Sequence, residues 1–263
     1  MLRIHLLRPG GQDYYVDQLV PGRPEGTGLV GERPGAWQGR AAAELHLSGI
    51  VGARELGELL SGRDPANGRQ LRAGRRDATA GFDLTFCAPK SVSLLGMLAP
   101  REIAHEVVAG HEAAVDDATG FLDRAAIGVR RARGGEQLRL GATGAAAGAF
   151  LHRTSRALDP HLHTHLVVAN VAHGVDGDWS SLDSRRLFRH SSAIRAVYHA
   201  RLRAELTARL GVAWDVRPSG MGDVVGVDPV LRGLFSGRSA DIAEHLHGRR
   251  LSSRAGGARS RRI

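Results

Sequence analysis

Residues 152–171, HRTSRALDPHLHTHLVVANV, constrain the fold of this chain more than any other stretch. The second half predicts a strand in which every other residue lies on one face. The residues that share this face are His161, His163, His165, Val167 and Ala169. Asp159 and Pro160 favour a turn just before it, so the stretch predicts a β-hairpin.

Three of the histidines can meet on one face of this hairpin. A four-residue loop at 157–160 pairs Arg156 with His161 and puts His152 opposite His165. A register slip of one residue would turn His152 to the other face. Three neutral imidazoles with an open coordination position suit a Lewis-acid metal ion, whereas a lone H-x-H pair is more often part of an ordinary surface. We therefore predict His152, His163 and His165 as metal ligands and His161 as a rim residue.

The charge of the chain indicates a polyanionic partner. Its 263 residues carry a formal net charge of +9, and Lys90 is the one lysine among 36 basic residues. Such an excess favours nucleic acid or an anionic membrane surface. No apolar run approaches the roughly 20 residues of a membrane span. The single cysteine, Cys87, rules out a disulfide within the chain and fits a reducing cytoplasm.

Helix and strand signals alternate without regular βαβ spacing, which predicts an α+β fold with a mainly antiparallel sheet flanked by helices. We expect a half-buried strand in GFDLTFCAP, with Phe82, Leu84 and Phe86 facing one way. The other expected strands are residues 1–8, a hairpin over 127–142 and the short segment VAWDV. The expected helices cover 53–60, 101–126 and 192–210, the last ending at Gly211. Residues 1–247 are predicted as one domain and 248–263 as a basic, disordered tail.

Three segments in this order resemble the relaxase domain of the TrwC/TraI-like (MobF) conjugative relaxases, which are HUH endonucleases. The segments are GFDLTFCAPKSVSLL, HRTSRALDPHLHTHLVVANV and GVDPVLRGLFSGRS, with Tyr14 and Tyr15 near the N-terminus. The similarity runs over about residues 1–247 and implies the palm-like fold of HUH relaxases.

The resemblance implies a bacterial cytoplasmic enzyme that nicks one DNA strand at an origin of transfer. A tyrosine attacks the scissile phosphate, becomes linked to the 5′ end and leaves a free 3′-hydroxyl. The implied partners are single-stranded and hairpin DNA, with relaxosome accessory proteins and a coupling protein. The implied cofactor is a divalent ion, Mg²⁺ or Mn²⁺ in the cell, with Zn²⁺ or Ni²⁺ as alternatives.

Residue by residue, the resemblance assigns the nucleophile to Tyr14, with Tyr15 as its neighbour. Asp83 matches the family aspartate beside the nucleophile and a metal histidine. Lys90, at the start of a predicted helix, is expected to contact a phosphate. The arginines expected to follow the DNA backbone are Arg72, Arg75, Arg76, Arg130, Arg131, Arg133, Arg153 and Arg156.

The sequence departs from the family pattern in two ways. Many relatives carry a second tyrosine pair before the W-x-G motif, which is Trp37-Gln38-Gly39 here. Gly26 and Thr27 stand where those tyrosines usually fall, so termination would need Tyr15, a second molecule or reuse of Tyr14. The chain also lacks the G-x-x-x-x-G-K-[ST] motif of a helicase. A stand-alone relaxase, a truncated chain and a gene remnant all fit this.

Three other functions stay open. The first is a rolling-circle replication initiator-type HUH nuclease, although the motif order argues against it. The second is a non-catalytic remnant that binds an origin, and the third is a histidine-metal hydrolase in which Tyr14 has no role.

Overall fold

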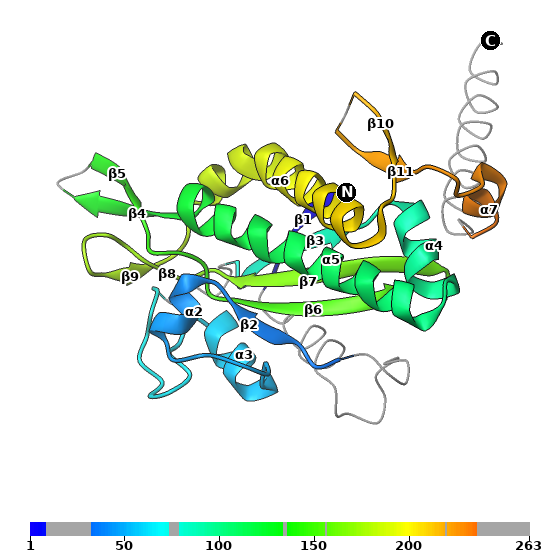
Figure 1. Cartoon of the computed structure of the whole chain (residues 1–263). Helices are drawn as coiled ribbons and strands as arrows, with labels where there is room; N and C mark the ends of the chain where they lie inside the picture. The colour runs from blue at the N-terminus through cyan, green and yellow to red at the C-terminus, as the bar shows by residue number, and fades with distance from the viewer. Residues whose placement is uncertain (9–32, 74–78, 134–135, 156, 219, 236–263) are drawn as a thin grey trace, which may run out of the picture.

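A five-stranded antiparallel sheet forms the centre of the computed structural model (Figure 1). The structure describes residues 1–8, 33–73, 79–133, 136–155, 157–218 and 220–235. The strand order is β1 (Leu2–Leu7), β3 (Gly81–Cys87), β7 (Pro160–Ala169), β6 (Ala147–Thr154) and β2 (Ala36–Gln38). Every neighbouring pair is antiparallel, which confirms the predicted α+β class.

Helices cover both faces of the sheet. The long helices α5 (Arg101–Phe121) and α6 (Ser184–Leu210) lie side by side over one face (Figure 1). Their apolar residues pack with Phe82, Leu84 and Phe86. The short helices α2 (Arg40–Glu44) and α3 (Ala53–Leu60) cover part of the other face, where they pack with Phe150 and Val167.

This two-sided cover corrects the prediction of a half-buried strand at residues 81–87. All seven residues of β3 are buried, including Asp83 and Thr85. The alternation of polar and apolar residues does not mark a solvent face here. It marks a buried polar site on one side of a central strand.

The other predicted helices and strands are present with shifted ends, and several short elements were not predicted. Helix α6 begins at Ser184, eight residues before the predicted start, and ends as predicted at Gly211, whose φ of 66° is left-handed. The predicted helix 101–126 is α5 followed by the π-helical turn η1 (Leu122–Ala126). The smaller elements are α4 (Lys90–Leu98), β4 (Gly128–Arg133), β5 (Glu136–Gly141), β8 (Ala172–His173), β9 (Trp179–Ser180), β10 (Trp214–Val216), β11 (Gly222–Val224) and α7 (Pro229–Leu234).

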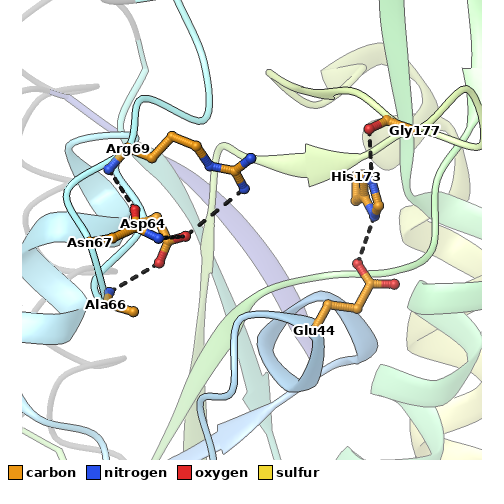
Figure 2. A network of polar contacts seen from close by, with 7 residues as sticks. All are labelled: Glu44, Asp64, Ala66, Asn67, Arg69, His173 and Gly177. Carbon is orange, nitrogen blue, oxygen red and sulfur yellow. Dashed lines mark hydrogen bonds and ion pairs between the residues drawn. The ribbon is translucent and has the colours of Figure 1, made fainter.

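Polar contacts hold the connections around α2 and α3 in place (Figure 2). The imidazole of His173 lies 3.0 Å from Glu44 Oε2 and 3.0 Å from the carbonyl oxygen of Gly177. In the loop after α3, Asp64 accepts hydrogen bonds from the Ala66 amide and the Asn67 side chain, each at 3.0 Å. These contacts are structural and lie outside the histidine cluster.

Within the described residues, no helix has the length and apolar character needed to cross a membrane. The predicted tail 248–263 and the boundary at residue 247 lie outside the described residues.

Candidate active site

The hairpin of β6 and β7 brings the predicted ligands together in a register that differs from the prediction. His152 lies opposite His163, whereas the prediction placed it opposite His165. The connection between the strands is longer than a four-residue loop, since Thr154 pairs with Pro160. The difference amounts to two residues of β7, so His152 keeps its predicted face. We call this side of the sheet, which carries His152, His163 and His165, the histidine face.

A break in strand pairing lies directly beside these predicted ligands. The register shifts between His152 and Thr154. Such irregularities are common next to active sites, where they redirect a side chain. The ring of His161 lies 4.6 Å from that of His163, between ring centres, so His161 adjoins the cluster and its role as a rim residue stays a prediction.

The three predicted ligands form a compact cluster of rings. The ring centres of His152 and His163 are 5.3 Å apart, those of His152 and His165 are 5.5 Å apart, and those of His163 and His165 are 5.1 Å apart. Metal–nitrogen bonds of about 2.1 Å put the centres of rings that share one ion roughly 5 Å apart. The backbone therefore brings the rings to the spacing that a shared ion requires.

Asp83 orients one of the predicted ligands. The Nδ1 atom of His165 lies 2.8 Å from Asp83 Oδ2 and 3.0 Å from Oδ1. A carboxylate only accepts, so Nδ1 donates, and the neutral form of the ring then has its lone pair on Nε2. This is the carboxylate–histidine pairing that orients metal ligands in many proteins.

A backbone carbonyl orients a second predicted ligand in the same way. The Nδ1 atom of His163 lies 2.7 Å from the carbonyl oxygen of His161, so it donates and leaves the lone pair on Nε2. Burial lowers the pKa of His163 to about 2, because the charged ring would lose its hydration. His163 is therefore neutral at physiological pH, as a metal ligand must be.

The donor chemistry, the ring spacing and the neutral state of His163 fit a divalent metal ion. The donor atoms themselves are not converged: among the described residues, no three His, Cys, Asp or Glu side chains form a finished metal site. The fit therefore depends on the strand register and on the hydrogen bonds at Nδ1 of His163 and His165. His152, His163 and His165 would hold the ion.

A buried polar chain behind the cluster was not predicted from the sequence. His111 of α5 is fully buried, with Nδ1 2.9 Å from the Tyr198 hydroxyl and Nε2 2.8 Å from Thr164 Oγ1. Thr164 lies between His163 and His165 in β7 and points to the other face. A sequence signal existed, because His111 occupies an apolar helical position, four residues after Val107.

Several predicted residues lie outside the described part of the chain. These are Tyr14, Tyr15, Arg75, Arg76 and Arg156, together with the side chain of Arg133. Their roles stay predictions.

The basic residues that the structure does describe differ from one another. Lys90 donates from Nζ to the carbonyls of Pro160 at 2.9 Å and Phe235 at 2.8 Å, so one ammonium N–H is left for a phosphate. Burial lowers the pKa of Lys90.

Among the predicted DNA-binding arginines, Arg153 is exposed, as the prediction of a DNA contact requires. Arg72 is buried and donates to Leu60, and Arg131 pairs with Asp176, so neither is placed to follow a DNA backbone.

The sequence profile of the TrwC relaxase family matches residues 8–263. The chain belongs to the TrwC relaxase family. Among curated proteins, this relaxase is 34% identical over 259 residues to the multifunctional conjugation protein TraI of Escherichia coli K12. A second Escherichia coli TraI is 36% identical over 230 residues. The alignments cover 93% and 82% of the chain but only 14% and 12% of the two relatives, so the chain spans about one seventh of their length or less.

Solved structures of TrwC resemble this relaxase throughout the fold. The metal-free complex of TrwC with OriT DNA has a TM-score of 0.82 and 31% sequence identity, covering 95% of this chain and 84% of that one. The metal-bound complex with OriT DNA gives the same values. A TrwC complex with a 27-mer that contains the recognition hairpin and cleavage site has a TM-score of 0.81, with 31% identity and coverage of 95% and 83%.

Proposed function

We propose that this relaxase is a metal-dependent nickase that cuts one DNA strand at an origin of transfer and joins itself to the 5′ end. Relaxases of the TraI and TrwC type are DNA-nicking tyrosine transesterases. The proposal places the reaction in the bacterial cytoplasm, as part of conjugative plasmid or mobile-element transfer.

One observation carries the proposal. In His163 and His165, a fixed hydrogen bond at Nδ1 leaves the Nε2 lone pair available, and the third ring, His152, lies within 5.5 Å of both. Two such bonds in one cluster pre-organise ligands for a cation. Isolated surface histidines have no need of this arrangement.

The chain's own residues define the proposed reaction. The Tyr14 phenol has an ordinary pKa of ~10, so it must lose its proton before it acts as a nucleophile. Its oxygen attacks phosphorus, the bond from phosphorus to the 3′ oxygen breaks, and that oxygen takes up a proton. The products are a 5′-phosphotyrosine and a free 3′-hydroxyl, so one ester replaces another and the nick can be resealed. A bound divalent ion supplies positive charge that stabilises the transition state.

An aspartate beside the nucleophile and a metal histidine can either take the tyrosine proton or orient a ligand. Both of its carboxylate oxygens lie within 3.0 Å of His165 Nδ1, which supports the orienting role. We assign Mg²⁺ or Mn²⁺ to the site in the cell, with Zn²⁺ and Ni²⁺ as ions that the imidazole set would also accept. Relatives have been solved in metal-bound and copper-bound forms, which supports a cation site without selecting one ion.

We further propose that the DNA partner is a hairpin followed by a single-stranded cleavage site, as in the TrwC complex with the 27-mer. Tyr15, Lys90, Arg75, Arg76, Arg153 and Arg156 remain proposed contributors to the active site or to DNA binding. Relaxosome accessory proteins and a coupling protein remain proposed partners.

The experiment incubates the full chain with single-stranded oligonucleotides that cover the transfer origin of its own replicon. Mn²⁺ is supplied in one arm and EDTA in the other, and denaturing gels separate free DNA from protein-linked DNA. We expect a covalent adduct that needs the metal and is absent in Tyr14→Phe.

Each alternative function predicts a different result in these assays. Cleavage without an adduct that survives Tyr14→Phe supports the hydrolase. Binding without cleavage supports the remnant. Adduct formation at a replication origin, but not at a transfer origin, supports the rolling-circle initiator.

A further inference from the structure

The edge strand β1 extends the histidine face beyond the metal cluster. Arg3 pairs with Thr85 in β3, and Thr85 pairs with His165 in β7. Residues paired across antiparallel strands project from the same face, so these three form one row across the sheet. The Cα of Arg3 is two strand spacings, roughly 10 Å, from that of His165.

The row changes from buried to exposed toward β1. Thr85 is 8% exposed, whereas the Arg3 side chain is exposed. Arg3 makes no ion pair or hydrogen bond with any part of the chain that the structure describes. No described residue therefore occupies the donors of its guanidinium.

Arg3 is also distinctive in its surroundings. In the described strands β1, β3 and β7, it is the one arginine or lysine that the register places on the histidine face. Lys90, at the start of α4, uses two N–H groups on carbonyls. The guanidinium is a planar fork of donors that matches two phosphate oxygens at once.

We propose that Arg3 binds a backbone phosphate of the DNA strand next to the scissile phosphate and so positions that strand over the histidine cluster. This inference rests on the proposed function, because it takes the DNA strand to cross the histidine face. It assigns Arg3 a positioning role and no part in bond breaking.

An exposed charge on an edge strand has an ordinary explanation as well. Charged side chains there prevent sheets from joining edge to edge. On that explanation, replacing Arg3 promotes self-association and leaves the DNA affinity of the monomer unchanged. The two accounts therefore predict different measurements.

The test compares Arg3→Gln, Arg3→Lys and the control Arg101→Gln in the full chain. Arg101 is also exposed, but it begins α5 on the opposite face. Binding of a fluorescent oligonucleotide covering the transfer origin is measured in EDTA at several salt concentrations. Size-exclusion chromatography gives the oligomeric state of each variant.

For Arg3→Gln we expect about tenfold weaker binding, the loss of one charge-assisted contact. The slope of log affinity against log salt should shrink by about 0.7, the value for one phosphate on a single strand. Arg3→Lys should fall between the parent and Arg3→Gln, and Arg101→Gln should match the parent. In nicking assays, Arg3→Gln should raise the DNA concentration for half-maximal rate more than it lowers the maximal rate.

An unchanged salt slope in monomeric Arg3→Gln overturns the inference, as does an equal loss in Arg101→Gln. If the parent nicks DNA and the slope is unchanged, only the inference fails. If the parent binds but never nicks and the slope still shrinks, the proposed function fails and the phosphate contact stands.

Discussion

Asp83 Oδ2 lies 2.8 Å from His165 Nδ1 across the β3–β7 pair, and both residues lie on the histidine face. The carboxylate is almost fully buried, whereas the imidazole is partly exposed. Asp83 thus contacts His165 from the buried side, and the Nε2 atom of His165 is directed away from the carboxylate.

Asp83→Asn should weaken metal binding roughly 10- to 100-fold, because an amide holds the ring without the carboxylate's charge and can favour the wrong tautomer. Isothermal titration with Mn²⁺ measures this directly. Circular dichroism shows whether the variant is folded. Unchanged affinity in a folded variant would contradict the orienting role.

His163 and His161 provide a matched pair of substitutions. His163→Ala should lower the nicking rate by at least about 100-fold, since it removes a ligand whose ion contributes several kcal/mol to the transition state. His161→Ala, whose ring lies 4.6 Å away, should keep most of the activity. Single-turnover gels measure both rates. If His161→Ala loses as much as His163→Ala, the ligand set is misassigned.

Acid should destabilise the protein through His111. Burial lowers its pKa to about 3, below the ordinary value of 6.5. Below pH 6.5 His111 becomes protonated in the unfolded chain but stays neutral in the folded protein. The free energy of unfolding therefore falls as the pH drops from 6.5 toward 3, by up to about 1.4 kcal/mol per pH unit. Above pH 6.5 this residue contributes no pH dependence.

Urea unfolding between pH 7.5 and 5, in EDTA, measures this slope. His111→Gln should show a shallower slope than the parent. If that variant does not fold, NMR titration of the parent should still find a neutral His111 at pH 5. A His111 ring that protonates near pH 6.5 in the folded state would contradict the prediction.

The W-x-G glycine should tolerate substitution less than the glycine after α6. Gly39 has a φ of 91° and ψ of 151°, a region nearly restricted to glycine, and an added Cβ would lie 2.2 Å from the Ala145 carbonyl oxygen. Gly211 has a φ of 66° and nothing within 4 Å of an added Cβ. Gly211→Ala should cost about 1 kcal/mol and Gly39→Ala about 2 kcal/mol or more. Equal losses in urea unfolding would contradict this.

The sequence was sufficient to predict the face of each of the three histidines but not its pairing partner. Alternation along a strand has a period of two, and the predicted register is wrong by two residues. His152, His163 and His165 therefore still lie on one face. The register itself depends on the loop between Thr154 and Pro160. Asp-Pro predicted a turn there but could not specify its length.

Burial and buried polar contacts were harder to predict. The cover over both faces of β3 depends on helices far away in the chain, so local alternation could not reveal it. The early start of α6 was missed because SRRLFRHS is rich in charge and short of apolar periodicity. His111 was missed because its partners, Thr164 and Tyr198, come from distant elements.

The central claim is that three imidazoles share one divalent ion. Anomalous diffraction from crystals of the full chain grown with Mn²⁺ tests it most directly. The account predicts one strong peak bonded to the Nε2 atoms of His163 and His165 and to a ring nitrogen of His152, at about 2.0–2.3 Å. A folded protein with no peak at the cluster, or with the ion bound only elsewhere, would contradict it.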